Sequence, residues 1–292
     1  MQIQKSFEIH DTGTLYIVPT PIGNLEDITY RALSILKSSH VIAAEDTRNT
    51  RKLLNYFDIY VPLMSYHEYS EMTRDAEIVK RLQAGEQVAI VSDAGMPAIS
   101  DPGSRIVEAA IAEDLPVVVL PGASAALCAV VGSGLNTNSF LFYGFLPRKK
   151  KERKSELEHL RKQRATLVFY ESPHRLKEML KALSEVLGNR KIALARELTK
   201  KFEEYLRGSV EEILHWAETT ELKGEFVVIV EGASIDLATE DETSVWWQEL
   251  SIKDHVAQLI EQKNISSKEA IKLVATERNL PKREVYQAYH VH

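Results

Sequence analysis

The sequence has only one cysteine among its 292 residues and contains no long hydrophobic run. A single cysteine excludes an internal disulfide, which suits a reducing compartment. No apolar stretch approaches the roughly 20 residues that cross a bilayer, and the N-terminus lacks a signal-peptide core. The nine histidines are scattered without ligand spacing, so we expect no metal site. Together these absences predict a cytoplasmic protein, with Cys128 as a small core residue in the apolar helical pattern 125–131.

An excess of basic charge is also missing. The 36 lysines and arginines are outnumbered by 42 acidic residues, which gives a net charge of −6. The molecule as a whole therefore does not have the charge of a nucleic-acid binder, and any such contact has to come from a local patch.

Short apolar runs alternate with amphipathic helical patterns over residues 14–232. This alternation predicts an α/β fold with largely parallel sheets, about five strands lying on each side of a turn at Pro121-Gly122-Ala123-Ser124. We predict an N-terminal α/β domain at 1–122, a second α/β domain at 123–235, and a linker with a small helical C-terminal domain at 236–292. The acidic stretch 236–242 is the expected linker. The predicted strands are 15–18, 40–44, 61–65, 88–91, 117–120, 140–143, 167–170, 192–195 and 226–230.

The loop from Asp93 to Gly103 is the most informative segment of the chain. It follows the apolar strand 88–91 and contains two glycines, two prolines and two aspartates. Glycine allows close approach of the backbone to a ligand, and proline fixes the direction of peptide groups. An ordinary strand-to-helix connection needs fewer residues. We therefore expect a small-molecule site here, because ligands of open α/β sheets bind at the carboxyl ends of the strands.

Polar clusters follow other predicted strands as well. They are Glu45-Asp46-Thr47-Arg48, Tyr66-His67-Glu68, Glu171-Ser172-Pro173-His174-Arg175 and Arg196-Glu197-Leu198-Thr199-Lys200. Taken singly, such a cluster is equally well explained as a helix start or a surface ion pair. Their repetition at successive strand ends predicts an enzyme.

Five segments carry a resemblance to a known family: 15–25, 44–48, 92–103, 169–175 and 195–200. They resemble the ribosomal RNA methyltransferases of the tetrapyrrole methylase superfamily, over about residues 14–232. The resemblance implies two α/β domains of tetrapyrrole-methylase type with S-adenosylmethionine in the cleft between them. It implies 2′-O-methylation of the ribose of a cytidine in 16S ribosomal RNA. The substrate is either the RNA itself or the small ribosomal subunit. The resemblance also implies a homodimer. Met96 stands at a position where threonine is common in this family, and Ala123 stands where proline is common. Both positions are expected to act through the shape of the backbone.

The resemblance also implies roles for single residues. A ribose hydroxyl needs a base to take its proton, and Asp46 is the first candidate, followed by Glu45 and Glu197. Four cations, Arg48, Arg175, Arg196 and Lys200, are expected to hold RNA phosphates. The residues expected to bind the cofactor are Pro21, Asp93, Gly95, Ala98, Ile99, Ser124, Tyr170 and Ala195.

A basic run provides the local patch that the net charge requires. Six of seven residues are basic: Arg148, Lys149, Lys150, Lys151, Arg153 and Lys154. A solvated helix start is the plain alternative, but a basic run in an acidic protein favours RNA binding with strong salt dependence. In the tail, Ser266-Ser267-Lys268-Glu269 is a capping-box pattern that opens a helix, and a second helix follows. This helix-turn-helix pattern either touches RNA or packs on the body or a second subunit.

Two other functions remain open on the sequence. One is methylation of a tetrapyrrole, such as a corrin or sirohaem precursor, for which neither the basic run nor the tail is needed. The other is a non-catalytic RNA-binding factor in ribosome assembly, for which an acidic rim is unexpected.

Overall fold

The computed structural model describes residues 1–6, 8, 11–67, 71–234, 247, 250–278 and 280–290, with only the backbone of Glu71 and Met72. The chain forms two compact units, Met1–Ala233 and Ser234–His292. The expected linker 236–242, Glu68 and part of the tail lie outside the described residues. The division of the first unit at residue 122 stays a prediction.

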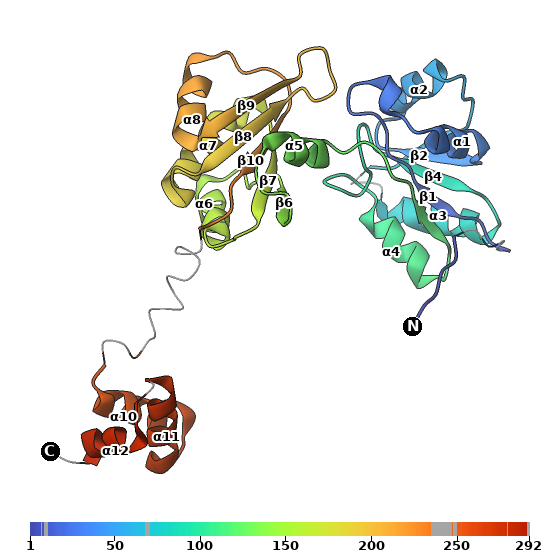
Figure 1. Cartoon of the computed structure of the whole chain (residues 1–292). Helices are drawn as coiled ribbons and strands as arrows, with labels where there is room; N and C mark the ends of the chain where they lie inside the picture. Colours follow the sequence, from blue (N-terminus) through green and yellow to red (C-terminus); the bar gives the residue numbers. More distant parts are fainter. Residues whose placement is uncertain are drawn as a thin grey trace. The chain divides into compact units, whose positions relative to one another are not determined.

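The first half of the first unit is built on a fully parallel sheet (Figure 1). Its strand order is β3-β2-β4-β1-β5. Helices α1 and α2 cover one face, whereas α3 and α4 cover the other. The prediction of parallel strands is confirmed for this sheet. The elements are β1 Leu15–Ile17, the 3-10 turn η1 Leu25–Asp27, α1 Tyr30–Ser38, β2 Val41–Ala44, α2 Thr47–Tyr56, β3 Leu63–Ser65, α3 Glu71–Gln83, β4 Val88–Val91, α4 Ser104–Ala112 and β5 Val117–Val119.

Alternation of apolar side chains explains why this sheet needs helices on both faces. In β4, Val88 and Ile90 pack with α3 and α4, whereas Ala89 and Val91 pack with α1 and α2. Strands that are buried on both faces read as continuous apolar runs. Helix α2 begins at Asp46, whose side chain accepts a hydrogen bond from the backbone N–H of Arg48.

The second half has a mixed sheet, so the prediction of largely parallel strands is wrong here. Its order is β6-β7-β10-β8-β9, and only the β6–β7 pair is parallel. Strands β7 and β8 both pair antiparallel with β10, so they run in the same direction and end at the same edge. The elements are β6 Phe140–Gly144, β7 Thr166–Glu171, β8 Lys191–Arg196, β9 Glu204–Ser209 and β10 Phe226–Val230.

Helices cover both faces of this second sheet too. Helices α6 Lys150–Leu160, α7 Pro173–Leu187 and α8 Val210–Thr219 pack on one face, and α5 Ala125–Ser133 packs on the other. Ala126, Ala129 and Val130 of α5 face the sheet, whereas Cys128 is exposed. The expectation that Cys128 lies in the core is therefore wrong. Helix α5 is apolar on all sides, so its sequence does not reveal which side is buried.

The second unit is helical. Helices α10 Ile252–Lys263, α11 Ser267–Glu277 and α12 Lys282–His290 share one small core. The capping box at Ser266 is confirmed, since its side chain and that of Glu269 bond reciprocally to the backbone. None of the helices in the described residues combines the length and apolar character needed to cross a bilayer.

Candidate functional site

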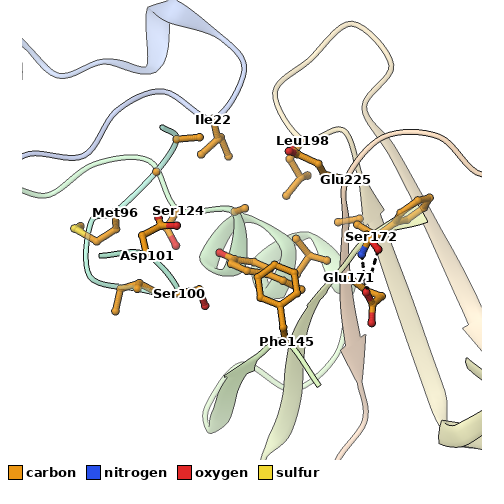
Figure 2. A pocket seen from close by; sticks show the side chains of 18 of the residues that line it. Ile22, Met96, Ser100, Asp101, Ser124, Phe145, Glu171, Ser172, Leu198 and Glu225 are labelled. Carbon is orange, nitrogen blue, oxygen red and sulfur yellow. Dashed lines mark hydrogen bonds between the residues drawn. The ribbon is translucent and has the colours of Figure 1, made fainter. Parts of the chain in front are cut away.

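A cavity of about 350 Å³ lies where the strand-end loops of the two sheets face each other. Figure 2 shows two groups of side chains across it. The first half of the unit contributes Ile22, Met96, Ser100 and Asp101, and the start of α5 contributes Ser124. The second half contributes Phe145, Tyr170, Glu171, Leu198 and Glu225. The sequence-based expectation of a site at the loop after the fourth strand agrees with this position.

The loop after β4 is held in a conformation that L-amino acids rarely adopt. Ala98 and Ser100 have φ values of 68° and 61°, and Gly95 has φ 78°. The backbone N–H of Ala98 donates to the carbonyl of Pro102 at 3.2 Å, which closes the loop on itself. Such strained residues cluster at ligand sites, where surrounding contacts maintain the strain.

Neighbouring loops hold this segment in place. Thr20 and Gly95 exchange two backbone hydrogen bonds of 2.9 Å, which join the loops after β1 and β4. The loop after β8 reaches the loop after β1, because the backbone N–H of Asn24 donates to Oγ1 of Thr199 at 3.1 Å. The two halves of the first unit therefore touch at the rim of the cavity.

The first candidate base, Asp46, is held in an ion pair. Its carboxylate accepts from Nε and Nη2 of Arg48 at 3.1 and 2.7 Å, and from the Arg48 backbone N–H at 2.8 Å. The hydrogen bond from the Arg48 side chain is the largest of the effects that lower the pKa of Asp46 to about 2. The lining of the cavity includes neither Asp46 nor Glu45. Burial raises the pKa of Glu45.

The third candidate, Glu197, supports a loop. Its Oε1 accepts from the backbone N–H of Glu225 at 3.0 Å and from Nζ of Lys200 at 3.1 Å. Burial acts to raise the pKa of Glu197, but these hydrogen bonds outweigh it and lower the pKa below its usual value. Glu197 is also absent from the lining.

Asp101, to which the sequence analysis assigned no role, lines the cavity. Burial raises the pKa of its carboxyl to about 6, the negative charges of Glu45 and Asp93 add to that shift, and a hydrogen bond with Ser92 opposes it. A carboxyl group with this environment in a cavity is typical of a functional site.

The cofactor candidates separate into two groups. Five line the cavity: Gly95, Ile99, Ser124, Tyr170 and Ala195. Three do not: Pro21, Asp93 and Ala98. Asp93 instead accepts hydrogen bonds from the Asp46 backbone and the Asn49 side chain, both at 3.1 Å. It thereby fixes the start of α2 beside the loop after β4.

Sequence reasoning missed several lining residues. The side chain of Met96 lines the cavity, and the expectation that this position acts through backbone shape stays a prediction. Phe145 and Leu198 were also missed. For Phe145 a signal existed, because it follows the predicted strand 140–143 directly after a glycine.

The cation candidates also differ in their surroundings. Arg48 pairs with Asp46, Arg196 donates to the carbonyl of Lys223 at 2.7 Å, and Lys200 pairs with Glu197 and Glu225. Arg175 donates to the carbonyl of Leu146 at 2.6 Å. Arg175, Arg196 and Lys200 therefore brace loops around the cavity.

Within the basic run, Arg153 differs from its neighbours. It is buried, donating to the carbonyl of Arg148 and to Glu178, both at 3.2 Å. The remaining five basic residues are exposed: Arg148, Lys149, Lys150, Lys151 and Lys154. We call these five the basic segment.

Comparison with known proteins agrees with this architecture. The family model for tetrapyrrole (corrin/porphyrin) methylases matches residues 14–214. The ribosomal RNA small subunit methyltransferase I of Bacillus subtilis (strain 168) is 52% identical over 281 residues, covering 96% of this chain and 95% of that protein.

Solved structures show the same fold at low identity. The methyltransferase CobJ has a TM-score of 0.58 and 20% identity, with 76% of this chain and 95% of that one covered. A uroporphyrin-III C-methyl transferase from Thermus thermophilus, complexed with S-adenyl homocysteine, has a TM-score of 0.54 and 20% identity, with 75% and 97% covered. This chain therefore belongs to the tetrapyrrole methylase family of methyltransferases, in the group of ribosomal RNA small subunit methyltransferase I.

Proposed function

We propose that the protein transfers a methyl group from S-adenosylmethionine to the 2′-hydroxyl of a cytidine in small-subunit (16S) ribosomal RNA. One observation carries the proposal. The exposed basic segment begins at Arg148, three positions after Phe145 in the cavity wall, so RNA bound there has its backbone next to the cavity. The relatives named for ribosomal RNA methylation support the same substrate. Such a substrate implies a cytoplasmic enzyme.

The cavity suits S-adenosylmethionine in size and surface. Its volume lies in the usual range for small-molecule sites, which are mostly apolar with a few polar groups. Tyr170 and Phe145 form an aromatic wall with ring centroids 5.7 Å apart, which fits a flat base. Backbone groups near Gly95 and the Ser124 side chain offer polar contacts.

Within this proposal, the cofactor set predicted from the sequence is kept. Gly95, Ile99, Ser124, Tyr170 and Ala195 contact the cofactor, while Pro21, Asp93 and Ala98 shape the loops behind it. The bound sulfonium supplies an activated methyl group, and the protein supplies alignment with the ribose oxygen.

The basic segment is suited to phosphate binding rather than to folding. It lies at the start of α6, where the positive end of the helix dipole disfavours cations. Lys149 alone of the five has an ion pair with a side chain of its own helix, to Glu152 at 2.8 Å, among those recorded for the described residues. In this proposal, RNA phosphates bound to the basic segment offset this unfavourable interaction with the helix dipole. The buried Arg153 supports this segment by donating a hydrogen bond to the carbonyl of Arg148.

Asp46, Glu45 and Glu197 remain the catalytic candidates of the sequence analysis, and a different role fits their geometry. In this proposal Asp46 orients the Arg48 guanidinium, whose own side chain is 86% exposed, toward an RNA phosphate. Glu197 orients Lys200, and Arg175 and Arg196 brace the loops that carry the RNA contacts.

The direct test is methyl transfer from labelled S-adenosylmethionine to small ribosomal subunits that lack their native ribose methylations. The product is mapped by resistance to alkaline cleavage, because a methylated 2′-oxygen cannot attack the adjacent phosphate. We expect label at a single cytidine. Label on a corrin or sirohaem precursor instead, or RNA binding without any transfer, would contradict the proposal.

We also propose that the protein is a homodimer that uses the outer face of α5. Leu127 and Val131 are 52% and 77% exposed and lie one turn apart with Cys128 beside them. A second copy of this chain would cover this apolar stripe. Sedimentation should give a dimer for the wild type and a monomer for Val131→Glu. A wild-type monomer would contradict this part of the proposal.

A further inference from the structure

We propose that Asp101 is the catalytic residue that accepts the proton of the ribose hydroxyl, an inference that rests on the proposed function. The cavity lining contains three carboxylates among the described residues: Asp101, Glu171 and Glu225. A proton acceptor needs access to the substrate hydroxyl and freedom from a competing cation.

The other two carboxylates are engaged. Oε1 of Glu171 accepts from the backbone N–H of Ser172 at 2.7 Å, and Oε2 lies 3.5 Å from Nη2 of Arg175. Figure 2 shows this carboxylate held against Ser172. Glu225 pairs with Lys200 at 2.9 Å, and its side chain is 84% exposed. Both carboxylates therefore have a competing cation close by.

The loop geometry holds Asp101 in the cavity wall. The strained residues Ala98 and Ser100 precede it, and Ser100 lies against the end of β6, where a Cβ added to Gly144 would be 3.0 Å from its Oγ. Figure 2 shows Asp101 beside Ser124, across the cavity from Phe145. The strain is thus used to place one carboxylate on the wall opposite the aromatic residues.

The groups facing Asp101 suit it to accept a proton. Glu45 and Asp93 face it from the ends of β2 and β4, Ser92 is hydrogen-bonded to it, and Tyr170 approaches from β7. Burial and the two negative charges raise its pKa to about 6, so it is mostly ionised at neutral pH and is a stronger base than an ordinary aspartate. In contrast, the ion pair with Arg48 makes Asp46 a weak base.

The step balances as a simple displacement. The ribose oxygen forms a bond to the methyl carbon, and the carbon–sulfur bond breaks with its electron pair left on sulfur. The hydroxyl proton passes to the Asp101 carboxylate, which later releases it to water. No oxidant, reductant or metal ion is needed.

The experiment compares Asp101→Asn, Asp101→Glu and Asp58→Asn in the full-length protein. Asp58 is exposed at φ 53°, where asparagine is well tolerated, so its variant is a matched control outside the cavity. The readouts are kcat/KM for small ribosomal subunits from about pH 5 to about pH 8.5, which covers both sides of the expected pKa, cofactor affinity by calorimetry, and a carboxyl-carbon NMR titration. Thermal unfolding checks that each variant is folded.

We expect Asp101→Asn to lower kcat/KM by roughly 10²–10⁴-fold, the usual contribution of a positioned base, with cofactor affinity changed less than about threefold. Wild-type kcat/KM should rise with pH to a plateau above about 6, and the variant should lose this rise. Asp101→Glu should recover part of the rate, and Asp58→Asn should match the wild type. One NMR resonance titrating near pH 6 should be missing in Asp101→Asn.

Two results would overturn the assignment of Asp101. One is an Asp101→Asn enzyme as active as Asp58→Asn, and the other is a loss that lies wholly in cofactor affinity. Mapping the wild-type product separates this from failure of the proposed function. If the wild type methylates ribose and Asp101→Asn does so equally well, only the role of Asp101 fails. If the wild type methylates no ribose, both fail.

Discussion

The two halves of the first unit contribute to one cavity by different means. From the half with the parallel sheet, loops line the cavity. Their backbone is strained at Ala98 and Ser100, and they place polar groups in the cavity wall. The mixed sheet contributes side chains of the strands themselves, such as Tyr170, Ala195 and Val227, and these are mainly apolar. Backbone shape therefore defines the wall that we assign to chemistry, whereas side-chain surface defines the wall that we assign to binding.

The largest effect should come from changing backbone shape on the first wall. Gly95 has φ 78°, and a Cβ there would lie 3.3 Å from Cγ2 of Ile22. Gly95→Val should weaken S-adenosylmethionine binding on the order of a hundredfold, or about 2.7 kcal/mol, measured by calorimetry. Gly134→Val is the control, since Gly134 has φ 77° but no atom within 4 Å of an added Cβ. An equal loss of binding in both variants would contradict a specific dependence of cofactor binding on the backbone conformation at Gly95.

Next in size is the effect of removing charge from the second half. Lys150, Lys151 and Lys154 replaced together by alanine should raise the KM for small ribosomal subunits about tenfold and reduce the salt slope of binding by about three. The cofactor affinity should stay unchanged. Alanine at the exposed Lys37, Lys80 and Lys181 removes the same charge elsewhere, and an equal effect from that triple variant would contradict local binding.

Two carboxylates of the first half should respond to pH with opposite signs. The pKa of Asp101 is raised in the folded state, so its ionisation reduces the free energy of unfolding as pH rises from about 4 to about 6. Asp101→Asn should therefore be more stable than wild type at pH 7. The full shift corresponds to about 3 kcal/mol, and solvent screening of this partly buried group leaves about 1 kcal/mol. The gain should disappear below pH 4.

Asp46 supplies the contrasting case. Its pKa is lowered to about 2, so it stabilises the folded state above the unfolded pKa of about 4, and this is lost as pH falls through 2. Asp46→Asn should lower the unfolding temperature at pH 7. Calorimetric scans at pH 7 and pH 3 compare both variants, and a shift of the same sign for the two would contradict the assigned environments.

The smallest effect is expected on the outer face of α5. Because Cys128 is exposed, Cys128→Ser should change the free energy of unfolding by less than about 0.5 kcal/mol. Urea unfolding of the full chain measures this. A loss of several kcal/mol would indicate that the side chain is buried within its own chain.

Much of the parallel sheet was predictable from sequence because its strands are buried on both faces. Val88-Ala89-Ile90-Val91 reads as a strand without ambiguity. Strand β9, Glu204–Ser209, was missed because it lies at the edge of its sheet and its sequence shows neither a continuous apolar run nor a polar–apolar alternation. The direction of β10 was not predictable, since Phe226–Val230 is as apolar as any parallel strand.

The site was predictable in part. Gly95, Tyr170 and Ala195 lie in segments that resemble the family, and they line the cavity. Asp101 depends on positive φ angles at Ala98 and Ser100, which residue propensities do not predict. The burial of Arg153 did leave a signal, because Arg153, Leu157 and Leu160 share one side of a helix.

The hydrogen bond from Arg175 to the carbonyl of Leu146 holds the short backbone segment 145–148 in place. This segment begins with Phe145, which lines the cavity, and ends with Arg148, the first residue of the basic segment. A ligand in the cavity that displaces Phe145 and a phosphate that displaces Arg148 would therefore shift the same short stretch of backbone. If the cavity binds the cofactor and the basic segment binds RNA, as we propose, thermodynamic linkage makes the two effects reciprocal: the cofactor changes the affinity for RNA by the same factor as RNA changes the affinity for the cofactor.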